Sequence, residues 1–338
     1  MNNSEKLKFL IKRMKSMDYN KMMHTAKALH KKTGKPTAWL LADMAGCAVK
    51  YNAGYSDYKI AEMYNLNSDQ RKTQITRGLS NQIVRKMNPK EYWHYFDNKA
   101  EFNRVFEKYI KRQWYSLKDG TREGFYSWLK GKSDLIAKPI AGTCGVGVKK
   151  YTKAQYQAIP DFYEELIGSG IGIVEEYVIQ HEALSRINPS SVNTMRIVTL
   201  NGDKKYGIVY AALRIGNAGM NVDNVDSGGM ACPIDLDKGT LSASGADKAG
   251  NIYINHPVTG VTLKGYQLPY FEEAKAMCME ASKVVPQIRY IAWDVAITPT
   301  GPILIEGNSY PSHAIPQFSS HYPDGIGIMT EFRKFMTI

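Results

Sequence analysis

Acidic and amide side chains recur at a regular spacing near the C-terminal end of the chain, between Trp293 and Asn308. Two apolar, β-branched runs flank a Thr-Pro-Thr-Gly segment, which predicts a β-hairpin. With the turn centred on Thr300, Asp294 lies opposite Glu306, and Asn308 falls on the same face. Opposed carboxylates repel each other unless a cation lies between them, and such oxygen ligands suit Mg²⁺. The spacing therefore predicts a metal–nucleotide site, the alternative being a solvated hairpin face with two unrelated acids.

A glycine-rich loop follows Lys138 within a few residues. It reads Gly142-Thr143-Cys144-Gly145-Val146-Gly147, with three glycines in six residues. Such a loop lets backbone N–H groups close on phosphate oxygens, and the nearby lysine adds positive charge. The loop lacks the ending of a Walker A motif and opens no obvious helix, so neither that motif nor a dinucleotide fingerprint is predicted. A plain β-turn is the alternative interpretation.

A further cluster lies where an apolar run ends, at Val174-Glu175-Glu176-Tyr177-Val178, with Glu182 a few residues later. A strand end can present backbone N–H and C=O groups to the edge of an adenine, against an apolar wall from Val178. An acid farther along the chain suits ribose hydroxyls. The alternative is a buried strand whose acidic side chains face solvent.

Two arginines interrupt strand-like apolar segments, Arg196 in Met-Arg-Ile-Val and Arg214 in Ala-Leu-Arg-Ile. A buried charge needs a partner, and a guanidinium matches phosphate or carboxylate oxygens with two hydrogen bonds. Either arginine alone is equally compatible with an outward-facing position on a half-exposed strand.

The elements expected to position these residues change in character along the chain. The first part is predicted to be all-α, and strands begin near residue 134. The helices are expected over residues 4–33 (as a pair), 38–52, 56–64, 70–87, 99–115, 121–130, 153–167 and 269–286. The strands are expected over residues 134–138, 148–151, 171–178, 193–200 and 206–215. A Gly-, Asn- and Asp-rich loop over 216–229 has the composition of a functional loop.

Composition describes an ordinary globular chain of 338 residues, with 43% hydrophobic and 22% charged residues. No apolar run approaches the length of a membrane span, and the Lys-rich N-terminus lacks an apolar signal region, so a cytoplasmic protein is predicted. The cysteines lie at 47, 144, 232 and 278 and form no C-x-x-C pair. Reduced thiols are therefore expected, with neither a disulfide framework nor a zinc site.

The net charge of +12 is concentrated in the N-terminal part of the chain. Residues 1–135 hold 27 basic and 13 acidic side chains, whereas residues 136–338 hold 17 and 19. A basic N-terminal part suits an anionic membrane surface, nucleic acid or a phosphorylated sugar. A solvated face that keeps the protein soluble is the alternative, because the charges are spread out.

Taken in order, the lysine and glycine loop, the Glu-Glu-Tyr-Val strand, the arginines and the Asp…Glu-x-Asn hairpin resemble the ATP-grasp superfamily. The resemblance covers roughly residues 97–330. It implies an α+β ATP-grasp catalytic core, in which two subdomains clasp ATP, behind an all-α N-terminal domain. The expected boundaries are 1–96 for the helical domain and 97–338 for the core, divided at about 131–180 and 181–338.

The resemblance also implies roles at matching positions. Lys99 and Lys138 match the two nucleotide-binding lysines, and Glu182 matches the ribose acid. Asp294, Glu306 and Asn308 match the ligands of two Mg²⁺ ions. The phosphate flap is matched by Gly142, Thr143, Gly145 and Gly147, and the adenine hinge by Glu175, Glu176, Tyr177 and Val178.

Within the superfamily the chain is most similar to the sugar-transfer-associated ATP-grasp proteins, on four features. These are Asn188-Pro-Ser-Ser-Val-Asn-Thr-Met-Arg196, Arg214 with its Gly/Asn/Asp loop, Ile305-Glu-Gly-Asn308, and Ser56-Asp57-Tyr58 in the all-α part. Peptide-forming ATP-grasp ligases often carry an arginine two residues before the metal-binding Asp. Here that position is Ala292, which leaves Arg214 or Arg196 to stabilise the transferring phosphoryl group.

The resemblance implies an ATP-dependent ligase that joins a carboxylate to an amine or hydroxyl acceptor through an acyl phosphate. Its substrates are expected to be sugar or polysaccharide precursors, or amino acids. His313 follows the metal ligands and is either a substrate-facing or a structural histidine. Two alternatives remain: an ATP-grasp kinase acting on a hydroxyl, and a non-catalytic protein that binds an anionic glycan or nucleic acid through its basic half.

Overall fold

The computed structural model describes residues 18–142, 146–220 and 222–338. The part of the helix pair expected over residues 4–33 that precedes residue 18, and the flap positions Thr143 and Gly145, lie outside these residues. Two compact units make up the chain. One comprises the N-terminal helices up to Ile83 with His313–Lys334 and Ile338, and the other comprises Val84–Ser312 with Phe335–Thr337. This grouping differs from the expected split at residue 96, because residues after 312 join the helical unit.

The helical unit is built from short amphipathic helices whose apolar sides meet around Ala26, Leu40 and Met63. Helix α2 ends at Gly34, whose φ of 74° provides the left-handed turn that stops it. The helices that lie in this unit, or begin or end in it, are α2 (Tyr19–Thr33), α3 (Thr37–Tyr51), α4 (Tyr55–Ile60), η1 (Met63–Asn65), α5 (Ser68–Arg71), α6 (Arg77–Met87), η4 (Ile315–Gln317), η5 (Ser319–His321) and α15 (Met329–Phe335).

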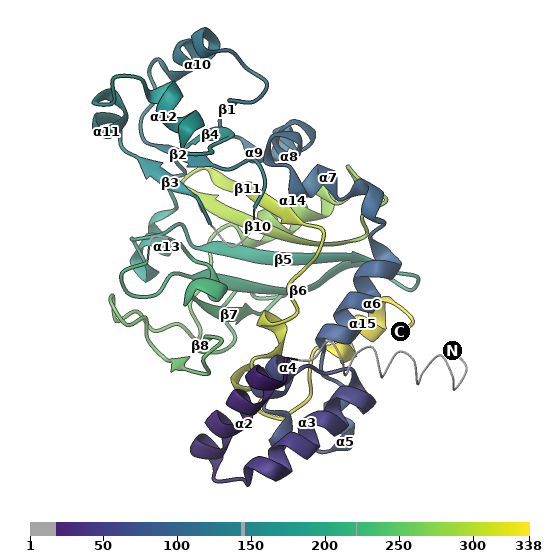
Figure 1. Cartoon of the computed structure of the whole chain (residues 1–338). Coiled ribbons are helices and arrows are strands. Elements are labelled where there is room, and N and C mark those ends of the chain that lie inside the picture. The colour runs from purple at the N-terminus through teal and green to yellow at the C-terminus, as the bar shows by residue number, and fades with distance from the viewer. Residues whose placement is uncertain (1–17, 143–145, 221) are drawn as a thin grey trace. The chain divides into compact units, whose positions relative to one another are not determined.

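The second unit holds two sheets (Figure 1). The smaller has four antiparallel strands in the order β1-β4-β2-β3. Its strands are β1 (Trp114–Ser116), β2 (Leu135–Lys138), β3 (Lys149–Tyr151) and β4 (Ile173–Glu176). One core, with Phe125 and Phe162 at its centre, forms between this sheet and α10 (Arg122–Leu129), α11 (Lys153–Gln157) and α12 (Phe162–Gly168). The small subdomain thus begins before residue 131, where sequence had placed its start.

The larger sheet has seven strands in the order β11-β10-β5-β6-β7-β8-β9. They are β5 (Thr194–Asn201), β6 (Tyr206–Ile215), β7 (Met230–Ile234), β8 (Gly245–Ala246), β9 (Ile252–Tyr253), β10 (Tyr290–Thr298) and β11 (Gly301–Asn308). The remaining helices of the unit are η2 (Lys90–Tyr92), α7 (His94–Asp97), α8 (Lys99–Val105), α9 (Glu107–Ile110), α13 (Glu182–Ile187), η3 (Val225–Ser227) and α14 (Phe271–Ala281). Trp293, fully buried, packs against Phe96 and Phe106 and joins the sheet to α7–α9.

Several helix predictions were wrong in extent: the helix expected over 70–87 is divided into α5 and α6, and the helix expected over 56–64 ends at Ile60. The physical reason can be identified for two others. The helix expected over 99–115 stops at Ile110, because Lys111 adopts a left-handed φ of 46°, and the chain then enters β1. The helix expected over 153–167 divides into α11 and α12 around Pro160, and Asp161 caps the second helix by accepting from the Glu164 N–H. The short strands β7–β9 had no clear sequence signal.

Two other expectations concern thiols and membrane spans. In the part of the chain that the structure describes, Cys47, Cys232 and Cys278 are buried free thiols. Among the same residues, no helix is both long and apolar enough to cross a membrane.

Candidate functional site

The hairpin of β10 and β11 brings Asp294 and Glu306 opposite each other, which confirms the expected pairing. The register differs from a uniform turn centred on Thr300, because Thr298 pairs with Gly301 at the tip. Between Asp294 and Val295 the register shifts by one residue at a β-bulge, in which Ile305 is the extra residue of β11. This shift brings Asp294 opposite Glu306.

Two arginines neutralise the buried Asp294. Arg196 donates from Nε to Oδ1 at 2.5 Å and from Nη2 to Oδ2 at 2.9 Å, and Arg214 Nη1 lies 3.1 Å from Oδ2. Burial alone would raise the pKa of Asp294, but these two cations outweigh it and hold that pKa below its usual value. The arginines that looked anomalous in apolar strands are therefore ion-paired on the sheet.

Glu306 shows the opposite behaviour. Its pKa is raised, first by burial and then by the negative charge of Asp294, to which it hydrogen-bonds. The repulsion between the two acids favours the protonated form of Glu306, and a divalent cation would relieve the same repulsion.

The oxygen donors around Glu306 fit a hard cation. Asn308 lies next to it on the second cavity described below, and its Nδ2 donates to the Ala292 carbonyl at 3.3 Å, which leaves Oδ1 as an acceptor. Among the described residues no group of three or more His, Cys, Asp or Glu side chains gathers as a metal cluster. The carboxylate of Glu306 and the amide oxygen of Asn308, with a carboxylate oxygen of Asp294, suit Mg²⁺. This ion needs few protein ligands, because it takes the others from water and phosphate.

Glu175 lies at the centre of a second charged cluster, buried where β4 meets β2 and β11. Lys138 Nζ donates to its Oε2 at 2.5 Å, and Arg112 approaches both carboxylate oxygens at 3.0 and 3.1 Å. Asn103 Nδ2 donates a further hydrogen bond of 2.8 Å to Oε1 of Glu175. Burial would raise the pKa of Glu175, but Arg112 and Lys138 hold it well below its usual value.

Arg112 also connects the two sheets of this unit. Its Nη1 donates to the Leu304 carbonyl at 2.5 Å and its Nη2 to the Ile305 carbonyl at 3.2 Å. One guanidinium therefore bridges Glu175 on the small sheet and the bulged part of β11, directly before Glu306.

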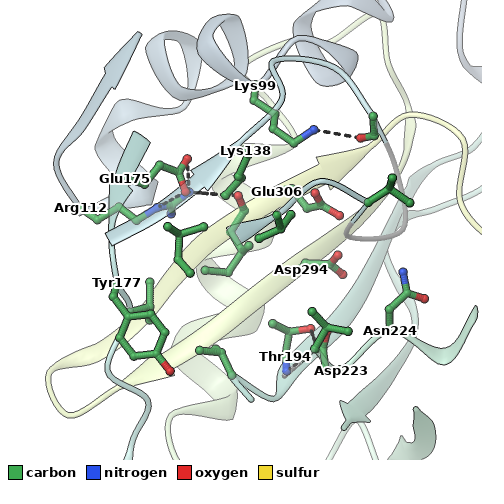
Figure 2. A pocket seen from close by; sticks show the side chains of 18 of the residues that line it. Lys99, Arg112, Lys138, Glu175, Tyr177, Thr194, Asp223, Asn224, Asp294 and Glu306 are labelled. Atoms are coloured by element: carbon green, nitrogen blue, oxygen red, sulfur yellow. Dashed lines mark hydrogen bonds and ion pairs between the residues drawn. The ribbon is translucent and has the colours of Figure 1, made fainter. Parts of the chain in front are cut away.

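Lys99 differs from the other cations of the site. Its Nζ donates to the Gly142 carbonyl at 2.9 Å, at the base of the glycine-rich loop (Figure 2). Within the described ranges, no carboxylate forms an ion pair with it, whereas Lys138 is paired with Glu175. Burial lowers the pKa of Lys99, with Lys138 adding to the effect and Glu306 opposing it. Lys99 is thus positioned to accept an anionic group from outside the protein.

Asp223 orients the outer side of Arg214. Arg214 Nη2 donates to Asp223 Oδ1 at 2.8 Å, and the Thr194 N–H donates to Oδ2 at 3.0 Å. Thr194 Oγ1 also contacts Oδ2 (Figure 2). Asp223 comes from the 216–229 loop, whose first residue is held by His256 through a 3.0 Å contact from Nε2 to the Gly216 carbonyl.

These residues surround a cavity of about 210 Å³ between the two sheets. A neighbouring cavity of about 300 Å³ shares part of its lining and reaches Asn308. The expected site residues on the first cavity are Lys99, Lys138, Gly142, Glu175, Glu176, Tyr177, Val178, Arg214, Asp294 and Glu306. The fold therefore brings together, around one cavity, residues that are separated by more than 200 positions in the sequence.

Some expected site residues lie elsewhere. Glu182 begins α13, is largely exposed and pairs with Arg186, away from the cavity lining. Arg196 reaches the site only through Asp294, and Gly147 lies outside the lining of both cavities. His313 belongs to the helical unit, where its Nε2 lies 3.1 Å from the buried Asp57.

Sequence reasoning missed Asn103, Arg112, Thr194 and Asp223. Arg112 had been assigned to the end of a helix, and Asp223 belonged to a loop identified as functional without individual contacts. Arg112 could have been identified by its position, because it is a charged residue between the end of a helix and the start of a strand.

The hinge residues combine structural and pocket-facing groups. Glu176 pairs with Lys132 at 3.1 Å and accepts from the Gln113 N–H at 2.9 Å. Tyr177 lines the cavity with Val178, and Lys150 Nζ lies 3.8 Å from the centre of its ring. The strand end thus presents an aromatic ring and an aliphatic side chain toward the cavity.

Comparison with known proteins gives a family match and distant structural similarity. Three similar solved structures are the ATP-grasp ligase PsnB complexed with a phosphomimetic variant of minimal precursor, Mg and ADP; VanG D-Ala:D-Ser ligase from Enterococcus faecalis; and D-cycloserine synthetase DcsG. Their identities to this chain are 12%, 13% and 11%, with TM-scores of 0.39, 0.43 and 0.42. No curated protein matches.

The matched regions differ in extent. This chain is covered over 70%, 76% and 82% of its length, and it covers 58%, 62% and 93% of those chains, respectively. The chain therefore spans less than two thirds of the PsnB and VanG structures. The family model for sugar-transfer-associated ATP-grasp proteins matches residues 78–323, which confirms both the expected family and the α+β class with its ATP-grasp core and helical N-terminal part. The chain belongs to the sugar-transfer-associated ATP-grasp family.

Proposed function

We propose that this protein is an ATP-dependent ligase that activates a carboxylate as an acyl phosphate and transfers the acyl group to an amine or hydroxyl. The observation that carries this proposal is the single cavity that brings together the hinge residues, the lysines, Arg214 and the paired acids. Family membership supports the use of ATP. Residues 97–338 are the proposed extent of the catalytic core. Within this range, His313–Lys334 and Ile338 belong to the same compact unit as the N-terminal helices.

The nucleotide is proposed to enter between the two sheets with its adenine at the end of β4. Tyr177 and Val178 supply the apolar surface there. Lys99 and the glycine-rich loop are proposed to approach the phosphates, because Lys99 donates to the Gly142 carbonyl and forms no ion pair with a carboxylate of the described residues. Glu182 is not among the residues that line the cavity, and its contact with the ribose stays a prediction.

In the first step a substrate carboxylate oxygen attacks the γ-phosphorus of ATP, and the bond to the departing ADP breaks. Arg214 and Lys138 offset charge on the transferring phosphoryl group, and Asp223 and Glu175 hold those cations in position. Catalysis of this kind depends on placement and on charge neutralisation within a site that is already organised.

Glu306, Asn308 and a carboxylate oxygen of Asp294 are proposed to hold Mg²⁺. The family resemblance implies two ions. The metal would supply charge neutralisation at the phosphates of ATP. A cation held there would also offset the repulsion from Asp294 that contributes to the raised pKa of Glu306.

In the second step the amine or hydroxyl attacks the acyl carbonyl carbon, and inorganic phosphate leaves. Carboxylate is a poor electrophile, so the phosphoryl group provides the leaving group. A sugar-linked acid or acceptor is proposed from the family description, and a cytoplasmic location is proposed because ATP is consumed.

The test is release of ADP and phosphate from Mg·ATP with a panel of amino acids, sugar acids and nucleotide sugars. Equal amounts of ADP and phosphate, requiring both an acid and an acceptor, are expected from the wild type. Glu306→Gln should lower the rate at least about tenfold, since it removes an anionic ligand. Glu280→Gln is the matched control, because Glu280 is a surface acid paired with Lys283.

The other outcomes contradict the ligase. ADP formed without free phosphate identifies a kinase that phosphorylates a hydroxyl. Absence of both turnover and Mg·ATP binding favours the non-catalytic binding protein.

A further inference from the structure

Helix α3 presents an apolar face that the described structure leaves exposed. One side of α3 is buried through Leu40, Met44 and Cys47 in the core of the helical unit. We call the opposite side the α3 apolar face; its exposed residues are Ala38, Trp39, Ala42, Ala45, Gly46 and Val49. The spacing of three and four places them on one stripe about 16 Å long. Trp39 is 44% exposed and Val49 62% exposed.

A polar stripe would be expected at these positions on a surface helix. The one acid of α3, Asp43, does not supply it, because it is engaged by Arg71 at 2.7 Å through both carboxylate oxygens and accepts from the Tyr58 hydroxyl. Apart from the indole N–H of Trp39, the exposed face therefore offers neither hydrogen-bonding side chains nor negative charge.

Lysines stand at both ends of this face. Lys35 Nζ lies 5.1 Å from the centre of the Trp39 ring, and Lys50 follows Val49 directly, 5.5 Å from the ring of Tyr51. Neither lysine forms an ion pair with an acid in the described part of the chain. The adjoining α2 exposes four more lysines, of which Lys21 pairs with Asp18 and Lys32 with Glu62, whereas Lys27 and Lys31 form no ion pair with a described acid. The face is thus apolar in the middle and cationic around it.

We propose that the α3 apolar face and its lysines form a docking surface for an anionic membrane. An amphipathic helix with lysines beside its apolar side lies in the plane of the lipid headgroups, with a tryptophan ring at the boundary. Lysines beside it are drawn to anionic lipid phosphates. Trp39 and Val49 enter the headgroup layer, and Lys35 and Lys50 remain at the phosphates.

Other partners fit less well. Nucleic-acid surfaces use arginine and polar groups to contact phosphates and bases, whereas the centre of this face is Ala, Gly and Val. A second copy of the chain would bring the same lysines together across a two-fold axis. The sequence before α2 holds Lys6, Lys8, Lys12, Arg13 and Lys15 against Glu5 and Asp18, a net positive charge that favours an anionic surface.

The test is flotation of the full-length protein with phosphatidylcholine vesicles, with or without about 30% phosphatidylglycerol, at low and high salt. Binding is expected to the anionic vesicles alone, falling about tenfold between about 50 and 500 mM NaCl. Trp39→Gln and, separately, Lys35→Glu with Lys50→Glu should each weaken binding about tenfold.

Matched controls change the same residue types on the second unit. Ile254→Gln replaces another exposed apolar side chain, and Lys238→Glu with Lys264→Glu replaces two exposed lysines. Both should bind vesicles as the wild type does, and all variants should retain the wild-type melting temperature.

Three results would overturn the proposal. The first is equal binding to neutral and anionic vesicles, or none to either. The second is equal loss of binding in the control variants, which would indicate a nonspecific charge effect. The third is tight binding of a single-stranded oligonucleotide, or a concentration-dependent dimer, that is abolished by Trp39→Gln while vesicle binding persists.

Discussion

At the scale of single residues, the site is organised by acids that hold cations. Glu175 receives Lys138, Arg112 and Asn103 together, and Asp294 receives both Arg196 and Arg214. A buried charge without partners is costly, so each of these acids depends on its cations for stability and each cation on its acid for direction.

Glu175 is expected to contribute stability in a pH-dependent way. Its folded-state pKa lies below the ordinary 4.5, so its contribution is complete above that pH and is lost as the pH falls below it. Glu175→Gln should reduce the free energy of unfolding at pH 7 by about 3–5 kcal/mol, because Arg112 and Lys138 lose their buried anion. The difference from wild type should shrink in acid, as measured by urea unfolding from pH 7 to pH 3.

Glu182→Gln provides the matched control for that measurement. Glu182 is an exposed acid paired with Arg186 on α13, so the variant should unfold as the wild type does at every pH. An equally large loss in both variants would contradict a specific role for the Glu175 cluster.

Asp223 is expected to affect turnover more than nucleotide affinity. It holds the outer side of Arg214, so Asp223→Asn should lower kcat at least about tenfold while changing the KM for ATP much less. Asp223→Glu should restore part of the rate. Asp226→Asn, in the same loop but paired with the exposed Lys248, should behave as wild type. Equal effects of the two Asn variants would indicate a general loop defect.

At the scale of elements, the β10–β11 hairpin controls where the acids meet. Its tip is tight, with Thr298 Oγ1 donating to the Gly301 carbonyl at 2.8 Å, and the bulge farther along shifts the register by one residue. Because one residue of slip turns every side chain to the other face, the bulge decides whether Glu306 reaches the cavity.

Replacement by alanine should change the free energy of unfolding in opposite directions at Gly301, in a turn, and at Gly46, in a helix. Gly301 has φ of 119°, with open space around a Cβ, so Gly301→Ala is strained by backbone conformation alone. It should cost about 1–3 kcal/mol of unfolding free energy. Gly46→Ala, in the exposed part of α3, meets no atom within 4 Å and should stabilise by up to about 1 kcal/mol. Urea unfolding measures both, and the same sign for the two would contradict this.

At the scale of the whole molecule, the helical unit is assembled from both ends of the chain. Asp57 accepts from the Gly54 and Arg77 N–H groups at 2.7 and 3.0 Å and contacts His313 Nε2 at 3.1 Å. The Gln74 side chain donates to the Gly325 carbonyl at 3.0 Å. The segment after residue 312 is therefore part of the helical unit although β11 precedes it directly.

Asp57→Ala should loosen this unit selectively. Loss of a buried acceptor with several donors should cost about 2–4 kcal/mol. Amide exchange should accelerate over residues 52–83 and 313–334 and stay slow in β5, β10 and β11. Asp69→Ala, at an exposed acid paired with Lys72, is the control and should change little. Uniform acceleration across both units would contradict a local role.

The sequence by itself determined the features that depend on local pattern. Alternation of apolar residues and a Thr-Pro-Thr-Gly turn are properties of neighbouring residues, so the hairpin and its two acids could be predicted from the sequence. The exact pairing of Asp294 with Glu306 also depends on the bulge at Ile305, which the alternation does not predict. The order of motifs likewise identified the family. The helix ends at Lys111 and Pro160 were harder to predict from the sequence, because one apolar pattern is compatible with several helix ends.

Only the tertiary structure decided which distant charges meet. Arg112 reaches Glu175, 63 positions away, and the Leu304 carbonyl, 192 positions away, and Asp223 reaches Arg214 from the 216–229 loop. Such partners are chosen by burial: once the sheets pack, an unpaired charge in the interior is too costly, and the acid that lies within reach completes the site. No local pattern contains that information, because the cost arises only after the segments come together.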